Sequence, residues 1–529
     1  MHLADYLVLA TYFAVVLAMG IGLRGKVQTS DEFFLSGRSL PLWITGIAYL
    51  SANLGSLELM GFVANGAKYG VFTSQLYWIG CVPAMIFAGL VMTPLFYRRR
   101  IRSIPEYLRL RFDERTRTLN AAGFAVLTVL TSGINLYGLA IVFRALFHWP
   151  VNISILAAAS TVLCYVAWGG LRASIYTEVL QFILIIVGLF PLAIIAYRAA
   201  GGIAGFTAHM PQDMLHAWRP VLHPAGTPYG GGLFSVIVGL GFVVSFAYWS
   251  TDFLVMQRAL AARDLESAKK TPVVAAFGKA FFPVLTVIPG LAAVMLIPNE
   301  IRGNYNLTLP LMIMRYYPVG LLGLGVTALM ASFMAGMAGN VTAFNTVWTY
   351  DIYQTHIAPG RSDRHYLAVG RIATIGGVLL SVGAAYMALQ FDDIFEYWSL
   401  LSSIFIGAGF ATFFLGIFVP WVHARGAFWG MLTGYGVAVA NYILFREGVL
   451  HYGSMMEMDF LGGTWGFIAN GLIACTLSLS GKRKSRRELE GLIFHTPKTE
   501  PSGTYWLFRP GTLAIAVVAL TVALNIIFR

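Results

Sequence analysis

The sequence predicts an all-α polytopic membrane protein with about 14 transmembrane helices. Of its 529 residues, 57% are hydrophobic and only 11% are charged, whereas a soluble domain averages roughly 25% charged residues. The mean hydropathy is +0.71, and many segments reach the roughly 20 apolar residues that a membrane-spanning helix needs. These observations exclude a soluble enzyme, a disordered chain and a nucleic-acid-binding domain.

The predicted spans follow one another with short polar connections. They are 4–24, 41–66, 72–97, 119–146, 151–168, 174–197, 231–256, 272–297, 319–350, 367–390, 394–418, 426–445, 462–480 and 507–528. The first span lacks the basic segment and cleavage site of a secretion signal, so we interpret it as a retained helix. The longest connections are 98–118, 198–230 and 481–506, and none leaves room for an appended catalytic domain.

Positively charged residues gather in alternate connections. Connection 98–118 holds eight arginines, and the cytoplasmic loops of membrane proteins carry an excess of Lys and Arg. With this connection inside, 27 of the 36 Lys and Arg residues face the cytoplasm and eight face outward. We therefore expect a multi-pass protein of the cell (inner) membrane with both termini extracytoplasmic. The net charge of +12 is interpreted as a signal of topology in a lipid bilayer, with no nucleic acid as partner.

Two predicted spans, 41–66 and 231–256, contain more small and polar residues than is usual for a continuous membrane helix. The residues concerned are Ser51, Asn53, Gly55, Ser56, Glu58, Gly61, Asn65 and Gly66 in the first, and Gly239, Gly241, Ser245, Ser250, Thr251 and Asp252 in the second. Small residues also allow close packing of helices. Interrupted helices in corresponding places of two halves, however, indicate a transporter site near the midplane, and the carboxylate in each segment favours that interpretation.

Four ionisable residues, Glu58, Glu178, Asp252 and Lys279, fall deep within predicted spans. Such charges are costly in a bilayer and are usually paired or functional. Asp252 and Lys279 lie on consecutive helices, so they are candidate partners. Glu58 has no partner that the sequence identifies, and it could accept hydrogen bonds from solute hydroxyls or carry a proton. Glu178 is expected near the cytoplasmic start of its span, where a helix N-terminus stabilises a carboxylate.

Several stretches resemble the solute:sodium symporter family, in its sodium/glucose-cotransporter-like branch. In chain order they are FFLSGRSLPLW, SANLGSLELMG, WGGLRASIYTEVLQ, YWSTDFLVMQRALAA, AAFGKAFFPV, DIY, and the C-terminal RRELEGLIF and ALNIIF. The resemblance implies a leucine-transporter-like fold, in which two inverted repeats of five helices form the core.

The resemblance also implies a division of the chain into five segments. These are an extra N-terminal helix and cytoplasmic loop (1–40), the first repeat (41–198), an extracellular loop (199–230), the second repeat (231–418) and three C-terminal helices (419–529). The two interrupted spans would be the first helices of the two repeats.

Carried over by position, the resemblance implies a partly matching sugar site. Asn53, Tyr248, Asp252 and Lys279 match residues expected at or beside the sugar, with Tyr248 at the place of an inner gate. Glu58, Tyr77 and Ser399 stand at site positions where relatives carry other residues. Because unmatched buried polar groups penalise the wrong substrate, we expect a sugar or sugar-like solute bound through a different set of hydroxyl contacts.

The sodium site implied by the resemblance departs further from the family pattern. Its positions here are Ser51 and Leu54 in the first broken helix, and Ser332, Ala335 and Gly336 in the span 319–350. Ala335 and Gly336 replace two hydroxyl-bearing ligands, which leaves few oxygens for a hard cation. Glu178 replaces an Asp of a proposed second ion site.

Together the residues and the resemblance predict a secondary active transporter that imports a small polar organic solute by alternating access, with sodium as the expected coupling ion. A proton-coupled or uncoupled carrier and a sensor on the same fold remain open as alternatives. Since no cluster of metal ligands and no nucleophile–base pair occurs, we expect no enzymatic activity, no organic cofactor and no required protein partner.

Overall fold

The computed structural model describes residues 2–23, 36–391, 393–481, 483–494 and 506–529. Most of the cytoplasmic loop predicted to follow the first span, and much of the connection 481–506, lie outside these residues. Within them the regular structure is helical, apart from one isolated bridge that pairs Leu40 with Ala262. All site residues predicted from the sequence are described.

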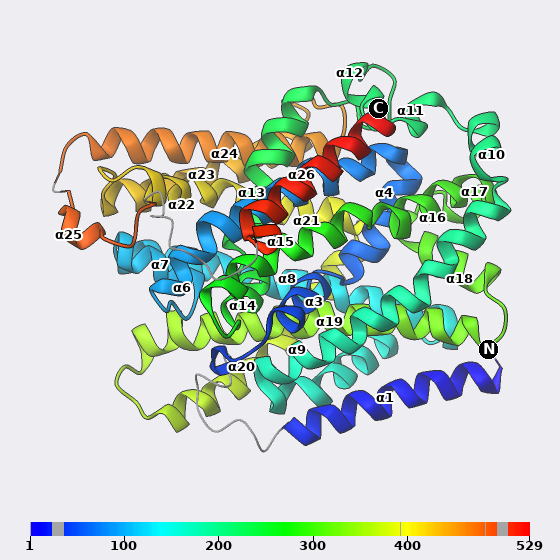
Figure 1. The fold of residues 1–529 in the computed structure, drawn as a ribbon, viewed down its shortest axis with the longest axis horizontal. Helices are drawn as coiled ribbons and strands as arrows, with labels where there is room; N and C mark the ends of the chain where they lie inside the picture. The colour runs from blue at the N-terminus through cyan, green and yellow to red at the C-terminus, as the bar shows by residue number, and fades with distance from the viewer. Residues whose placement is uncertain (1, 24–35, 392, 482, 495–505) are drawn as a thin grey trace.

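Long helices occupy the predicted spans. The continuous ones are α1 (Leu3–Leu23), α8 (Glu114–Phe147), α9 (Val151–Ala199), α19 (Leu321–Val347), α20 (Asp363–Ala388), α23 (Ala424–Arg446), α24 (Met455–Ser478) and α26 (Pro510–Ile527). In Figure 1, α1 and the pair α23 and α24 lie at opposite edges of the molecule.

Other spans consist of consecutive helical pieces. One such span consists of η5 (Leu76–Cys81), α5 (Val82–Phe87), η6 (Ala88–Met92) and α6 (Thr93–Arg98), and a second consists of α15 (Leu265–Phe281) and α16 (Pro283–Leu296). A third consists of α21 (Ile394–Ser402), η10 (Ser403–Gly407) and α22 (Ala408–Phe418). The helix α19 is itself extended by η9 (Trp348–Ile357). The shorter helices α7 (Ile104–Arg111) and α18 (Thr308–Tyr316) connect spans.

The predicted number of spans exceeds the number of described helices that are individually long and apolar enough to cross a membrane. Among the described residues, ten helices are long and apolar enough to cross a membrane, or eleven if one bent pair is counted as a span. The predicted spans 151–168 and 174–197 are joined in the single helix α9. Several other predicted spans are divided into short pieces, such as the apolar helix Leu42–Ser51. The count of 14 is therefore not confirmed.

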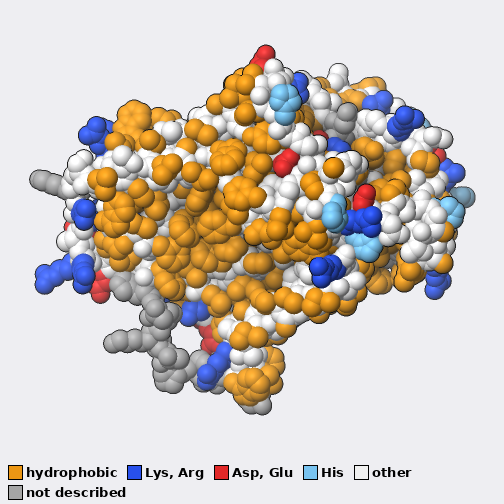
Figure 2. Space-filling model, turned by 90° about the horizontal axis from the view of Figure 1, so that it is seen from above, with side chains coloured by type: hydrophobic (Ala, Val, Ile, Leu, Met, Phe, Trp, Pro, Cys, Tyr) orange, Lys and Arg blue, Asp and Glu red, His pale blue; other side chains and the backbone are white. Residues whose placement is uncertain are grey.

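One face of the outer surface is largely apolar. Figure 2 shows hydrophobic side chains across the middle of one face, with Lys and Arg side chains mainly toward the two ends. This is the distribution that a bilayer requires of a spanning protein. The extent of burial distinguishes inner from outer helices. In the most apolar stretch of α19, 83% of the residues are buried inside the protein, whereas in that of α26 only 17% are buried. The helix α19 therefore lies in the core, and α26 at the periphery.

Both predicted helix breaks are confirmed. Helix α3 (Leu42–Ser51) ends at a non-helical stretch, 52–55, and the chain resumes as η3 (Leu57–Gly61) and α4 (Phe62–Tyr69). In the second half, η7 (Ser235–Val244) and α13 (Ser245–Thr251) meet α14 (Phe253–Leu260) at a bend of 50°. The Asp252 carboxylate lies at this bend, where it accepts a hydrogen bond of 2.7 Å from the Leu254 backbone N–H and caps α14.

The Asp351 carboxylate of the DIY stretch fastens η9 to neighbouring helices. It accepts hydrogen bonds from the Arg117 guanidinium of α8 at 2.6 Å and from the Ser103 hydroxyl at 2.8 Å. Arg117 also donates to the Tyr350 carbonyl at 2.9 Å. These bonds place a buried ion pair in a structural role, away from the two helix breaks.

Candidate solute site

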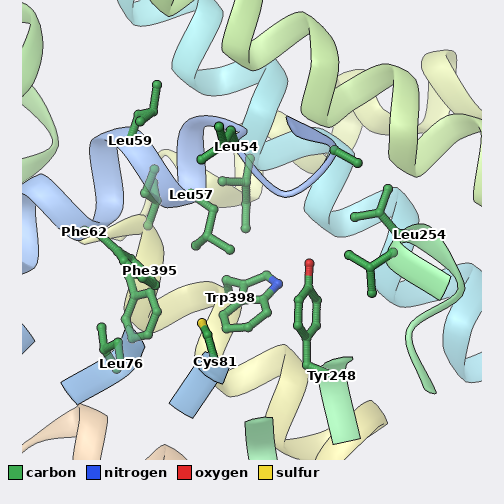
Figure 3. Close-up of a cluster of buried hydrophobic side chains, with 14 of the residues drawn as sticks. Leu54, Leu57, Leu59, Phe62, Leu76, Cys81, Tyr248, Leu254, Phe395 and Trp398 are labelled. Carbon is green, nitrogen blue, oxygen red and sulfur yellow. The ribbon is translucent and has the colours of Figure 1, made fainter. Parts of the chain in front are cut away.

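A small chamber lies between the two broken helices. Its volume is about 40 Å³, and it is lined by Asn53, Leu57, Glu58, Phe62, Leu76, Cys81, Leu240, Val244, Ser245, Tyr248, Trp249, Phe395, Trp398 and Phe460. In Figure 3, Tyr248 and Trp398 stand side by side, and Leu57 lies above Trp398. A cavity of this size holds only about three water molecules, so the chamber in this structure is too small for a solute.

A chain of hydrogen bonds joins four of the predicted site residues. The Lys279 ammonium group donates to Glu58 Oε1 at 2.7 Å, and the Asn53 amide donates to Glu58 Oε2 at 2.7 Å. The Tyr248 hydroxyl donates to the Asn53 amide oxygen. This chain connects the first broken helix with α13 and α15, so a shift of either broken helix changes the site.

The predicted pairing of Asp252 with Lys279 is wrong. Lys279 instead forms an ion pair with Glu58, and the side chains of both residues are at most 3% exposed. Asp252 caps α14 and does not line the chamber. The partner of Glu58 lies 221 positions along the chain, so the local spacing that suggested Asp252 could not reveal it.

Aromatic rings surround the Lys279 ammonium group. The nitrogen lies 5.0 Å from the centroid of the Phe282 ring, 5.5 Å from that of Trp249 and 5.9 Å from that of Tyr77. Ring faces attract a cation, most strongly where water is excluded. Tyr77, one of the predicted site residues, therefore belongs to the wall behind the ion pair, where its hydroxyl also lies 3.3 Å from that of Thr286.

Aromatic side chains that the sequence did not single out close the chamber. The Trp398 ring packs edge-on against Tyr248 at a centroid distance of 5.4 Å, and the Phe395 ring packs edge-on against Phe62 at 5.0 Å. The prediction for this helix was Ser399, which is buried but does not line the chamber. The chamber is lined instead by Trp398, the preceding residue on α21.

Removing the Tyr248 hydroxyl tests its contact with Asn53. We expect Tyr248→Phe to raise the KM for solute about 5- to 10-fold, because a net hydrogen bond contributes about 1 kcal/mol. The matched control is Tyr317→Phe, whose buried hydroxyl donates to the Gly188 carbonyl at 2.7 Å and is not part of the chamber lining. An equal KM for wild type and Tyr248→Phe in initial-rate uptake would contradict this role.

The positions of the predicted sodium site meet at the first helix break. The Ser332 hydroxyl of α19 donates to the Leu54 carbonyl. A Cβ atom added at Gly336 would lie only 2.8 Å from Gly55 Cα. Ala335 and Ser51 are also fully buried. The structure thus places α19 directly against the first helix break.

Glu178 lies in a setting different from the predicted one. It is inside the continuous helix α9, not at a helix N-terminus. The Arg258 guanidinium holds both its carboxylate oxygens, at 2.5 and 3.2 Å, and the Ser174 hydroxyl donates to one of them at 2.7 Å. Its charge is therefore balanced by Arg258, and this geometry does not support its assignment to a second ion site.

A second group of buried carboxylates lies beside the chamber, and nothing in the sequence pattern singled it out. Glu396 follows the lining residue Phe395, accepts a hydrogen bond of 2.7 Å from the Tyr69 hydroxyl and pairs with Lys68. Asp459 precedes the lining residue Phe460 and is fully buried. Only their position next to residues that line the chamber draws attention to them, and that position follows from the three-dimensional fold.

Comparisons with known proteins agree with this architecture. The family model described as the sodium:solute symporter family matches residues 33–434. The chain is 28% identical to sodium/glucose cotransporter 4 of Danio rerio over 480 residues, which cover 83% of this chain and 72% of the relative. It is 27% identical to sodium/myo-inositol cotransporter 2 of Mus musculus over 482 residues, which cover 84% of this chain and 70% of the relative.

A solved structure has the same fold. The structure of a Na⁺-coupled sialic acid symporter superposes with a TM-score of 0.77 at 21% identity, and covers 91% of this chain and 99% of its own. With the two broken helices meeting at one chamber, this match confirms the leucine-transporter-like architecture. The chain belongs to the sodium:solute symporter family.

Proposed function

We propose that this protein imports a neutral, sugar-like polyol across the cell membrane by alternating access, driven by a sodium gradient. The observation that carries the proposal is the lining of the chamber. It combines one carboxylate, one amide and one phenol with the aromatic faces of Trp249 and Trp398. Polyols present hydroxyl groups, which donate and accept hydrogen bonds, together with an apolar ring face that packs against aromatic rings.

The charge of the chamber favours a neutral solute over an anionic one. Among the described residues that line it, Glu58 is the single charged group, and no Lys, Arg or His is present. The positive charge of Lys279 is already neutralised by Glu58 at 2.7 Å. A carboxylated sugar would therefore enter a site with an acidic side chain and no free cation to pair with it.

Solute binding requires the chamber to expand. A cavity of about 40 Å³ has room for roughly three waters and none for a sugar ring. The Tyr248 and Trp398 rings, which pack against each other at 5.4 Å, are the groups that must separate. We infer that their separation accompanies movement of α13 relative to α21 during alternating access.

Sodium coupling is supported by family membership and by the relatives, whose names state sodium cotransport. Glu58 pairs with Lys279 at 2.7 Å, so it is not the unpaired intramembrane carboxylate that would favour proton coupling. Proton-coupled, uncoupled and sensor functions are therefore outcomes of the experiment below and not part of the proposal.

The finer topology belongs to the same proposal. We place the first repeat at 41–198 and the second at 231–418, with 14 spans in total and both termini outside the cytoplasm. The support is one helix break at the start of each proposed repeat, together with the eight arginines of connection 98–118. Labelling of single cysteines placed at His2 and Arg529 in intact cells tests the orientation.

A panel of labelled solutes tests the substrate class. Proteoliposomes containing the full chain are given hexoses, myo-inositol and a carboxylated sugar, with sodium and proton gradients imposed separately. We expect uptake of a neutral polyol in the sodium gradient and none of the carboxylated sugar. Uptake of the carboxylated sugar alone, uptake driven only by protons, or binding without uptake would each overturn the proposal.

A further inference from the structure

The side chain of Asn135, on α8, occupies the space next to the positions where the sodium site lacks hydroxyl groups. A Cβ atom added at Gly336 would lie 2.6 Å from Asn135 Oδ1, and one added at Gly55 would lie 2.2 Å from the same oxygen. No real Cβ atom approaches an oxygen so closely, so both glycines are needed to admit this amide. Asn135 is 3% exposed. A third helix thus inserts an oxygen between the first helix break and α19.

Hydrogen bonds fix the orientation of the Asn135 amide. Its Nδ2 donates to the Thr131 carbonyl at 3.1 Å, and its Oδ1 accepts from the Ser56 backbone N–H at 2.9 Å. Exchanging the amide nitrogen and oxygen would set donor against donor and acceptor against acceptor, so the network defines which atom faces the glycines. The atom between Gly55 and Gly336 is therefore the carbonyl oxygen, which is a cation ligand in proteins.

The Asn135 oxygen retains capacity for a further partner. The Ser56 hydroxyl lies 3.0 Å from the Ile134 carbonyl and 3.1 Å from Asn135 Oδ1, and its single proton satisfies one of them at a time. When that proton is donated to Ile134, one lone pair of Oδ1 is open. An amide oxygen has two lone pairs, of which the Ser56 N–H uses one.

Other oxygens at the break are also available to a cation. The Ser332 hydroxyl donates to the Leu54 carbonyl, and this bond leaves the lone pairs of the hydroxyl open. The Ser51 hydroxyl is buried and has no hydrogen-bond partner in the structure. Burying a hydroxyl group without a partner costs folding free energy. A cation bound to the Ser51 hydroxyl oxygen would give it a partner and remove that cost.

We propose that the Asn135 carbonyl oxygen replaces the hydroxyl ligands absent at Ala335 and Gly336, so that the sodium site is shared by the first helix break, α19 and α8. The inference rests on the proposed sodium coupling and adds a ligand that the family pattern does not supply. It also makes Asn135 and a side chain at position 336 mutually exclusive, because both would fill one space.

Sodium binding without solute tests this assignment. Equilibrium binding of ²²Na⁺ to the purified full chain is compared for wild type, Asn135→Ala and Asn135→Asp. We expect Asn135→Ala to weaken sodium binding at least tenfold, and Asn135→Asp to retain or strengthen it, since it keeps an oxygen and adds a negative charge. The matched control is Asn345→Ala, which removes an equally buried amide whose nitrogen donates to the Thr374 hydroxyl.

A swap variant tests the mutual exclusion. Gly336→Ser alone should weaken sodium binding, because the new side chain meets the Asn135 oxygen. The triple variant Asn135→Ala, Ala335→Ser, Gly336→Ser should regain binding, since it exchanges the amide for two hydroxyls. Recovery in the triple variant also shows that a chain without the Asn135 amide can fold and bind sodium.

Two results would overturn the inference. One is unchanged sodium affinity in folded Asn135→Ala and Asn135→Asp. The other is a wild type that binds no sodium while the triple variant does, which would mean that the amide takes the place of the ion itself. The sodium-binding experiment contains no solute, so its result does not depend on whether the solute panel shows uptake of a polyol. The proposed sodium ligand and the proposed solute can therefore be rejected separately.

Discussion

Replacing Lys279 by methionine should abolish solute uptake and destabilise the protein. The change leaves the Glu58 carboxylate buried without its counter-charge, and breaking a buried ion pair from one side costs about 3–5 kcal/mol. Both side chains are at most 3% exposed, so solvent does not screen the loss. Glu58→Gln should have a similar effect, because it leaves the ammonium group among the rings of Phe282 and Trp249.

The double variant Glu58→Gln, Lys279→Met separates stability from transport. With both charges removed, we expect most of the lost unfolding free energy to return, as replacement of a whole buried pair is often neutral. Uptake should stay absent, because the carboxylate that accepts solute hydroxyls is missing. The measurements are the thermal midpoint in detergent and initial uptake rates.

Lys270→Met provides the control for these variants. It removes an ammonium group that pairs with Glu266 at 2.6 Å within the same helix, where an ion pair contributes only about 0.3–0.5 kcal/mol. Normal uptake by Lys279→Met, or a double variant less stable than either single one, would show that the pair does not hold the site together.

Replacing Arg258 by alanine should have the second largest effect, on folding and not on ion binding. Arg258 and Glu178 are both fully buried, and the guanidinium also donates to the Leu254 carbonyl at 2.6 Å. Its removal leaves the Glu178 carboxylate unpaired, at a cost of about 3–5 kcal/mol. We expect a large fall in the thermal midpoint. The thermal midpoint of Arg258→Lys should lie between those of wild type and Arg258→Ala, because an ammonium group keeps the positive charge but cannot contact both carboxylate oxygens as the guanidinium does.

Sodium binding distinguishes this structural role from the predicted second ion site. The variant Glu178→Gln, Arg258→Met removes both charges and should recover stability while it binds sodium as the wild type does. If Glu178 were an ion ligand, this folded variant would instead bind sodium more weakly. That result would restore Glu178 to the second ion site.

The sequence predicted the positions of local features well. Both helix breaks, at 52–55 and at Asp252, follow from runs of small and polar residues that cannot continue a membrane helix, and both are found. Asn53 and Tyr248 were predicted at one site and are hydrogen-bonded to each other. The contact between the first break and α19, through Ser332 and Leu54, joins positions that only the family resemblance had brought together.

Contacts between distant segments could not be predicted in the same way. Lys279 was assigned to Asp252 because the two lie on consecutive helices, but the fold brings it to Glu58. Asn135 gave no local signal, since its role depends on two glycines, Gly55 and Gly336, that lie on other helices. Trp398 was missed in favour of its neighbour Ser399, because one residue changes the helix face by about 100°.

Concentrative uptake tests the central claim most directly. Proteoliposomes containing the full chain are supplied with a labelled neutral polyol and an inward sodium gradient, and the internal concentration is followed until it is steady. We predict accumulation above the external concentration that disappears when an ionophore collapses the sodium gradient. Two results would contradict sodium-driven import. One is accumulation that persists after the sodium gradient has been collapsed, and the other is an internal concentration that only equals the external one whether or not the gradient is present.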